Sequence, residues 1–308
     1  MPAEQRSDDA APERIVSLLP SATEILFDLG LGDRVVGVTF ECDFPPEARS
    51  KRIVSTSALP EGLDPAGIDA VVKERMAAGE DLYRLDRGAF ADLDPDLVVT
   101  QDLCAVCAID VTEVDDALAH LGCSAEVLTL DPMTLDEVLD TIVTAGQATG
   151  TSAAASTIVA ALRDRLERLA TRVGDLHRPR TLVLEWTDPA FTAGHWVPDL
   201  VTAAGGEPVL GRAGERSVGV EWDAVSTSDA EVVIVAPCGF GLDGAAALAT
   251  EVMDAGRLPS GAEVWAVDAD AIVVRPGPRV VEGAEVFAAI LHPDHCGAPA
   301  PGSARRIG

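Results

Sequence analysis

Four of the six cysteines follow short apolar runs that predict buried β-strands, and they are Cys42, Cys104, Cys107 and Cys238. In an open α/β sheet, the loops beyond the carboxyl ends of the strands approach the ligand. A Cys-x-x-Cys pair holds two thiolates close enough to chelate one ion, and two more thiolates complete a tetrahedral site. The pattern therefore indicates a metal site, with zinc or an iron–sulfur cluster as the occupant. A redox dithiol at Cys104 and Cys107, or thiols packed as small apolar groups, are the alternatives.

A second candidate for chemistry is the sequence Arg275-Pro-Gly-Pro-Arg279. Its two prolines fix the backbone, and its glycine permits close approach of a ligand. The Arg275 guanidinium could bind a carboxylate, amide or phosphate, and an ion pair with Asp268 or Asp270 is the alternative. The chain contains no phosphate-binding Walker loop, no Gly-x-Ser-x-Gly and no His-Glu-x-x-His motif. Binding without turnover is therefore expected, unless the cysteines hold a cofactor.

The charge balance narrows the possible partners. The chain has 308 residues, with 23 basic and 51 acidic side chains and a net charge of −28. Such a surface repels nucleic acids and anionic membranes, and it is typical of an acidic proteome adapted to high salt. No apolar run approaches about 18 residues, so we expect no membrane span. The first residues lack the apolar core of a secretory signal. A cytoplasmic monomer is expected, or an extracytoplasmic one if the true start lies upstream.

The elements that must position these residues alternate between short β-branched runs and amphipathic stretches. This alternation predicts a parallel sheet covered by helices in each half of the chain, and thus an α/β protein with two Rossmann-like lobes. The strands are expected at 14–18, 35–38, 97–100, 124–128, 181–185, 232–236, 263–267 and 271–273.

Between the two halves, residues 135–172 lack proline and carry apolar residues at helical spacing. Thr134 is a suitable N-cap, and Glu137 would complete a capping box. Gly146 and Gly150 could kink the segment. We therefore predict one long α-helix joining the lobes. The expected boundaries are a disordered N-terminus at 1–13, an N-terminal lobe at 14–133, the linking helix at 134–173, a C-terminal lobe at 174–293 and a disordered tail at 294–308.

Four phrases carry a family resemblance: IVSLLPSATEILFDLG at 15–30, CDFPPEA at 42–48, LDPDLVVT at 93–100 and AGGEPVL at 204–210. Together they resemble the class III substrate-binding proteins of ABC importers for cobalamin and siderophores. The resemblance implies a ligand cleft between two lobes joined by a helix, and a permease as partner. Within the family, the chain looks most like the cobalamin-binding members. The expected ligand is a corrinoid, meaning cobalamin or a related cobamide. A siderophore or haem, and a metal-dependent enzyme or sensor built on the cysteines, are the alternatives.

A macrocyclic ligand would use aromatic and polar side chains in these loops. Trp186, Trp196 and Trp222 offer flat faces for stacking, with core filling as the alternative. His195 could coordinate a cobalt or iron centre, or it could bond to Glu185 or Asp188. The remaining predicted ligand contacts are Pro20, Ser21, Phe40, Phe44, Gln101, Phe240 and Arg275.

Overall fold

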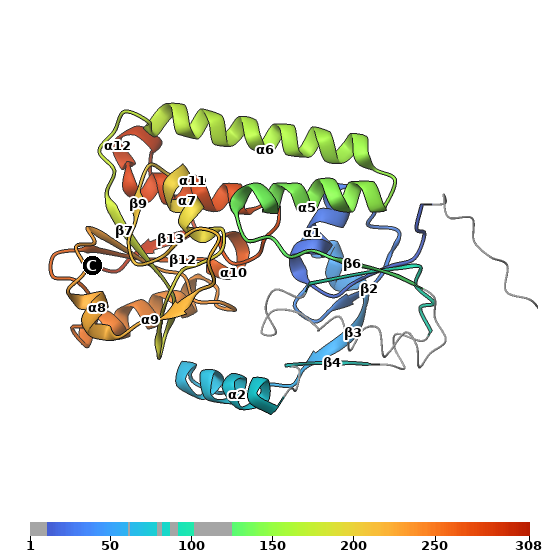
Figure 1. Cartoon of the computed structure of the whole chain (residues 1–308), viewed down its shortest axis with the longest axis horizontal. Helices are drawn as coiled ribbons and strands as arrows, with labels where there is room; N and C mark the ends of the chain where they lie inside the picture. Colours follow the sequence, from blue (N-terminus) through green and yellow to red (C-terminus); the bar gives the residue numbers. More distant parts are fainter. Residues whose placement is uncertain (1–10, 61, 79–81, 87–91, 102–124) are drawn as a thin grey trace, which may run out of the picture. The chain divides into compact units, whose positions relative to one another are not determined.

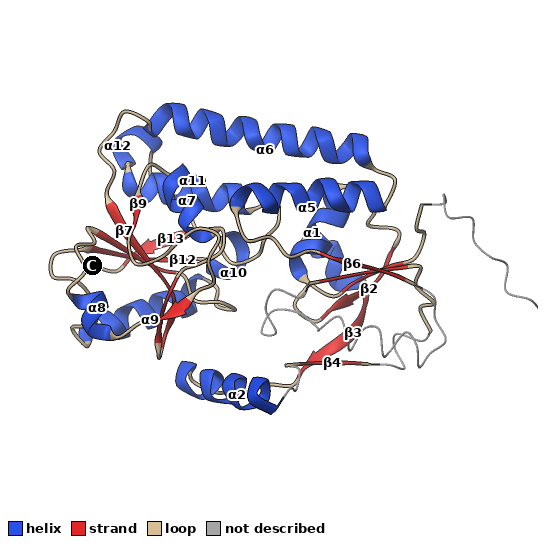
Figure 2. Ribbon diagram, in the orientation of Figure 1, coloured by secondary structure: helices blue, strands red, loops and turns tan. Residues whose placement is uncertain are grey.

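The computed structural model describes residues 11–60, 62–78, 82–86, 92–101 and 125–308. Two compact units account for the chain. The N-terminal unit takes its described residues from 1–60, 74–131 and 141–158, and the C-terminal unit comprises 61–73, 132–140 and 159–308. Each unit is built on its own sheet with flanking helices (Figures 1 and 2). The predicted α/β class with two lobes is confirmed.

The N-terminal sheet has the strand order β4-β3-β2-β1-β5-β6. All pairs are parallel except β3 with β4, which is antiparallel. Each strand is short, and β5 is buried along its whole length. The strands are β1 (Ile15–Ser17), β2 (Val35–Thr39), β3 (Arg52–Ser57), β4 (Tyr83–Leu85), β5 (Leu97–Thr100) and β6 (Glu126–Thr129).

Helix α1 (Pro20–Asp28) connects β1 to β2. Pro20 occupies its first turn, where a missing N–H costs no hydrogen bond. Ile25 and Leu26 are buried against the sheet, and Gly30, at φ +78°, reverses the chain after the helix. A short 3-10 helix, η1 (Pro46–Ser50), lies between β2 and β3. This geometry places the first residues of α1 directly after the carboxyl end of β1.

The C-terminal sheet has the order β10-β8-β7-β11-β12-β13, and β9 also pairs with β7. Its centre is the parallel set β7, β11 and β12, which forms a core with α9 built largely from valine, leucine and alanine. The strands are β7 (Arg180–Thr187), β8 (Ala190–Thr192), β9 (Glu207–Pro208), β10 (Val218–Gly219), β11 (Val232–Val235), β12 (Glu263–Val267) and β13 (Ala304–Arg306).

Helices cover this second sheet and pack closely against it. In α11, Gly283 lies against the last turn of α10, because a Cβ there would be 2.1 Å from the Ile272 carbonyl oxygen. The helices of this part of the chain are α7 (Val197–Ala203), α8 (Trp222–Ser226), α9 (Leu242–Asp254), α10 (Ala269–Ile272), α11 (Val280–Leu291) and α12 (Pro293–Cys296), and α2 (Pro65–Ala78) begins in the same unit. Within the described part of the chain, no helix is both long and apolar enough to cross a membrane.

Two predictions about the end of the chain are wrong. Residues 294–308, expected to be a disordered tail, contain the end of α12 and the strand β13, which pairs antiparallel with β12. Trp265 is the partner of Arg306 in this ladder, and the Arg305 guanidinium also bonds to Asp243 at 2.7 Å. Residues 271–273, expected to be a strand, instead lie at the end of α10 and just beyond it. The Gly- and Pro-rich composition of the tail predicted disorder, although β13 has only three residues and forms within it.

The prediction of a single linking helix is also wrong, because residues 135–172 fall in two helices, α5 (Leu135–Ala148) and α6 (Ser152–Val173). Gly150 adopts φ +71° at the break, and the Thr149 hydroxyl donates to the Ala145 carbonyl at 2.7 Å. The helices then pack without a gap, since a Cβ on Gly146 would lie 2.4 Å from the Ala155 Cβ. A glycine at the helix end and a second glycine at the helix–helix contact therefore specify a hairpin and not a strut.

The start of α5 follows the prediction. The Glu137 N–H donates to the Thr134 hydroxyl at 3.3 Å, and the Thr134 N–H donates to the Glu137 carboxylate at 3.2 Å. This is the reciprocal capping box expected from the sequence. The Asp199 carboxylate accepts a further bond from the Leu135 N–H at 3.0 Å, and burial raises the pKa of Asp199 above its usual value.

Candidate functional site

In the C-terminal unit, two predicted residues come together at the carboxyl ends of β7 and β11. Trp186 is the last residue but one of β7 and Phe240 follows β11, and their rings meet edge to face with centroids 5.7 Å apart. The indole N–H of Trp186 donates to the carbonyls of Asp188 at 3.0 Å and Pro65 at 3.3 Å. Gly244 leaves room for the Phe240 ring, because a Cβ there would lie 2.7 Å from it. The half-buried Trp186–Phe240 pair presents aromatic surface where a ligand approaches such a sheet.

The loop after β12 is tied to the same place. The Asp270 N–H donates to the Phe240 carbonyl at 3.3 Å, and the Arg275 guanidinium bonds to the Asp270 carboxylate at 2.6 Å. Arg275 is only 8 % exposed, and it forms its ion pair with Asp270, one of the two partners considered from the sequence. Burial also raises the pKa of Asp268 above its usual value, and the neighbouring Asp270 charge adds to this effect. The guanidinium thus positions the loop, and its action as a ligand clamp stays a prediction.

A polar cluster that the sequence did not predict surrounds Glu185. The Ser217 hydroxyl donates to the Glu185 carboxylate, and the Gly194 N–H donates to that hydroxyl at 3.2 Å. The Cys238 N–H donates to the Glu185 carbonyl at 3.2 Å. Ser217 is the first residue of the stretch SVGVEWDAV at 217–225, in which the sequence indicated only Trp222 as a ligand contact.

His195 is fixed by its backbone. It adopts φ +51°, its N–H donates to the Glu215 carbonyl at 2.6 Å, and its carbonyl accepts from the Gly214 N–H at 3.1 Å. Its Nε2 atom is buried and forms no hydrogen bond with any described residue. Burial, with a smaller contribution from the positive charge of Arg216, lowers the pKa of the imidazole. The ring is therefore neutral at pH 7, the form that can bind a metal, and coordination by His195 stays a prediction.

Two of the predicted stacking residues are part of the structural framework. Trp196 is 6 % exposed, and its indole N–H donates to the Val273 carbonyl at 2.7 Å. Trp222 packs against the core of the C-terminal sheet, and the Arg257 guanidinium lies 4.9 Å from the centroid of its ring. Trp196 is thus part of the core and a cation lies over the ring of the half-buried Trp222, and stacking of these two side chains on a ligand stays a prediction.

In the N-terminal unit, the residues predicted as ligand contacts divide by burial. Phe40 and Phe44, which follow β2, are 38 % and 39 % exposed, which is unusual for phenylalanine. Ser21, in the first turn of α1, and Gln101, just after β5, are buried at 3 % and 5 % exposure. Pro20 is half-buried at the start of α1. This unit thus offers two exposed aromatic side chains at the carboxyl end of β2.

Two of the four predicted cysteine ligands, Cys42 and Cys238, lie in the described part of the chain. Cys42 is buried and accepts a hydrogen bond from the Thr23 hydroxyl at 3.0 Å, whereas Cys238 is half-buried. Cys104 and Cys107 lie outside the described residues. Among the residues that are described, no group of three or more His, Cys, Asp or Glu side chains is arranged to hold a metal ion.

Both α/β units carry aromatic side chains at or just beyond the carboxyl ends of their strands, where ligands approach sheets of this kind. The chain belongs to the periplasmic binding protein family, whose model matches residues 15–255. The predicted family resemblance is therefore confirmed.

Two proteins are similar to the chain over most of its length. The chain is 28 % identical to a cobalamin-binding protein of Halobacterium salinarum over 295 residues, which cover 92 % of this chain and 70 % of that protein. It is 26 % identical over 294 residues to an uncharacterised ABC transporter substrate-binding lipoprotein of Bacillus subtilis, covering 92 % and 81 %.

Solved structures share the fold. The periplasmic vitamin B12-binding protein of Vibrio cholerae superposes with a TM-score of 0.61 at 22 % identity, covering 91 % of this chain and 97 % of that one. A periplasmic heme-binding protein of Pseudomonas aeruginosa gives 0.72 at 17 % identity, covering 96 % and 98 %.

Proposed function

We propose that this chain is a binding protein for a corrinoid, cobalamin or a related cobamide, and that it releases the ligand unchanged. The observation that carries the proposal is the match along 92 % of the chain to a protein named for cobalamin binding. A vitamin B12-binding protein of Yersinia pestis is also 25 % identical over 227 residues.

The aromatic side chains at the strand ends support this ligand class. A corrin ring is broad and flat, with an apolar face and amide groups at its edge. Trp186 and Phe240 in one unit, and Phe40 and Phe44 in the other, supply aromatic surface suited to such a face. The polar groups of Ser21, in the first turn of α1, and of Gln101, just after β5, suit amide groups.

The test is calorimetric titration of the purified protein with cyanocobalamin, cobinamide, haem and a ferric siderophore. We expect saturable, one-to-one binding of a corrinoid, tighter than that of haem or the siderophore. Tighter binding of haem or of the ferric chelate would move the function to that alternative within the same family. Absence of binding to all four ligands would refute the proposal.

We further propose that the protein acts as a monomer that delivers its ligand to an ABC permease. Size-exclusion chromatography with light scattering tests the first part, and transport by membranes carrying the candidate permease tests the second. Delivery to an importer requires the extracytoplasmic location that the sequence analysis gave as the alternative to a cytoplasmic one, and cell fractionation distinguishes the two.

The cysteine site remains a separate proposal. We propose that Cys42, Cys104, Cys107 and Cys238 can hold zinc or an iron–sulfur cluster, supported by their common position after predicted strands. Anaerobic purification followed by metal and sulfide analysis tests it, with Cys104→Ser expected to lower the metal content. Metal-free protein under those conditions would leave the corrinoid proposal standing without it.

A further inference from the structure

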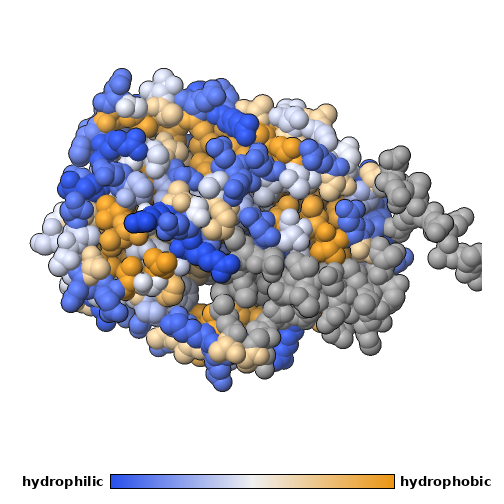
Figure 3. All heavy atoms as spheres, in the orientation of Figure 1, coloured by the Kyte–Doolittle hydropathy of each residue, from blue (hydrophilic) through white to orange (hydrophobic). Residues whose placement is uncertain are grey.

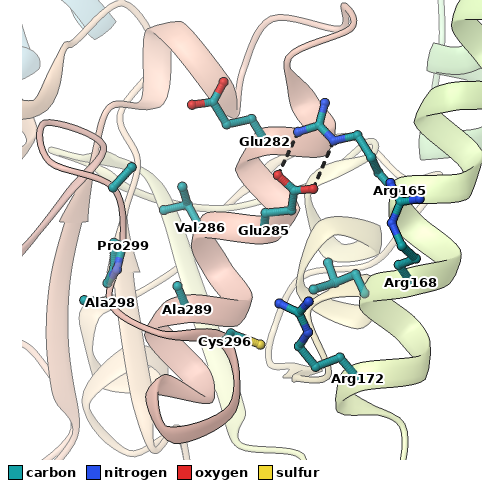
Figure 4. Close-up of a pocket in the computed structure, with 12 residues that line it drawn as sticks. Arg165, Arg168, Arg172, Glu282, Glu285, Val286, Ala289, Cys296, Ala298 and Pro299 are labelled. Carbon is teal, nitrogen blue, oxygen red and sulfur yellow. Dashed lines mark hydrogen bonds and ion pairs between the residues drawn. The ribbon is translucent and has the colours of Figure 1, made fainter.

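A pocket of about 510 Å³ lies in the C-terminal unit, between α6, α11 and the segment that follows α12 (Figure 4). None of the residues that line it belongs to the candidate corrinoid site. Its volume is within the range of pockets that hold small organic ligands, roughly 300–1,000 Å³. One of its walls carries three arginines, Arg165, Arg168 and Arg172, along one face of α6. The lining also includes Glu282 and Glu285, so it carries one more positive than negative charge, in contrast to the net charge of −28 of the whole chain.

The three arginines differ in how they are engaged. Arg165 is held by the Glu285 carboxylate through two hydrogen bonds of 3.0 and 2.7 Å, and this contact is the main cause that raises its pKa. Arg168 pairs with Asp164 of its own helix, and both side chains are more than half exposed, so the pair is weak and easily exchanged. Arg172 forms no ion pair with any described residue.

The unpaired Arg172 lies toward one end of the pocket, four residues from the weakly paired Arg168. In Figure 4 the Arg172 guanidinium lies on the side of the Cys296 sulfur, whereas Glu282 lies at the other end, beyond the Arg165–Glu285 pair. Arg168 and Arg172 are four residues apart on the helix, so their like charges repel unless an anion lies near both. Between the two ends the walls include the apolar side chains of Leu169, Val286, Ala289 and Pro299.

We propose that this pocket binds a small organic oxyanion, a phosphate or carboxylate group on a short apolar body. The anionic group would lie between Arg168 and Arg172, because guanidinium groups bind such oxygens through paired hydrogen bonds. The apolar body would lie against Leu169, Val286 and Ala289. The site takes a ligand of different chemistry from a corrinoid, and it does not rest on the function proposed above.

Cys296 provides a reporter inside the pocket, because its thiol is half-buried and lies in the wall. The full-length protein is treated with iodoacetamide at constant ionic strength, and alkylation of the Cys296 peptide is followed by mass spectrometry. The probes are phenyl phosphate, benzoate and inorganic phosphate. Phenyl phosphate is expected to protect Cys296 in a saturable way. Inorganic phosphate should bind more weakly because it lacks the apolar body.

The matched variants are Arg172→Gln and Arg163→Gln. Both side chains are exposed on α6, but Arg163 pairs with Asp140 at 3.5 Å and does not line the pocket. Arg172→Gln should weaken protection by about tenfold or more, the loss of one charge-assisted contact, and Arg163→Gln should leave it unchanged. Equal protection in the two variants, or protection reproduced by sodium chloride of equal ionic strength, would overturn the proposal.

Calorimetry of phenyl phosphate binding provides a second readout that is independent of the reactivity of Cys296. The wild-type protein and Arg163→Gln should give the same binding isotherm, and Arg172→Gln a weaker one. Absence of binding heat at several temperatures, together with an unchanged melting temperature at saturating probe, would also overturn the proposal.

Discussion

Replacing Gly146 by alanine places a methyl group at the contact between α5 and α6. The added Cβ would lie 2.4 Å from the Ala155 Cβ, and neither atom can rotate away, because both are attached directly to helical backbone. Overpacking of this kind costs about 1–3 kcal/mol. Alanine also favours a helix over glycine by about 1 kcal/mol. Gly146→Ala alone should therefore lower the free energy of unfolding by about 0–2 kcal/mol.

The reciprocal change separates the steric effect from the helix propensity. Ala155→Gly should destabilise by about 2 kcal/mol, since it loses helix propensity and a fully buried methyl group. In the double variant, the propensity changes cancel and the methyl group crosses to the other helix, so its stability should return to within about 1 kcal/mol of the wild type. The coupling energy between the two positions should thus be about 1–3 kcal/mol.

The assay is guanidinium denaturation followed by circular dichroism, with hydrogen exchange of residues 141–158 as the local readout. Both substituted positions belong to the N-terminal unit, so its transition should move if the two units unfold separately. Ala153→Gly, at an exposed position of α6, measures the propensity cost alone. If the effects of Gly146→Ala and Ala155→Gly add within about 0.5 kcal/mol, the close helix contact is not what requires glycine.

Three further predictions concern the candidate site. Trp186→Ala should weaken corrinoid binding by about 1–3 kcal/mol, by analogy with aromatic stacking platforms. Trp222→Ala should instead lower the melting temperature. If calorimetry shows a larger loss of affinity for Trp222→Ala than for Trp186→Ala, this assignment is contradicted. Because burial lowers the pKa of His195 in the folded protein, the unfolded chain binds the proton more readily, and stability should fall as the pH drops below the unfolded value of about 6.5. Denaturation of His195→Gln at several pH values should show a flatter dependence in that range, and an unchanged slope would refute the role of His195. Arg275→Ala should destabilise the protein by about 1–3 kcal/mol through loss of the bond to the half-buried Asp270, as measured by thermal unfolding, and Asp270→Asn should recover part of that loss in the double variant.

The central strands of both sheets could be predicted from the sequence, because buried parallel strands are continuous apolar runs. The predicted 97–100 and 263–267 coincide with β5 and β12, and 232–236 exceeds β11 by one residue. The short strands β8, β10 and β13 were missed, and β10 and β13 lie at the edges of the sheet. They have only two or three residues, and their sequences contain polar residues or glycine. Their pairing partners, and not their own composition, determine them.

Site residues were predictable to the extent that strand ends locate them. Trp186 and Phe240 meet because they lie at the carboxyl ends of neighbouring parallel strands, Trp186 within β7 and Phe240 after β11. Trp196 and Trp222 also lie near loops, but burial and a neighbouring cation engage them in ways that spacing does not reveal. The Arg275–Asp270 pair was one of two alternatives, and only the geometry of α10 selects it.

The pairing of β13 with β12 has a consequence for the synthesis of the chain. Residues 263–267 leave the ribosome well before residues 304–306, which complete their ladder. During that interval the nascent chain presents the hydrogen-bonding edge of β12 without its native partner. An unpaired strand edge readily pairs with another chain. A chain cut between β12 and residue 304 would keep this edge exposed, so we expect such a fragment to aggregate more readily than the whole chain.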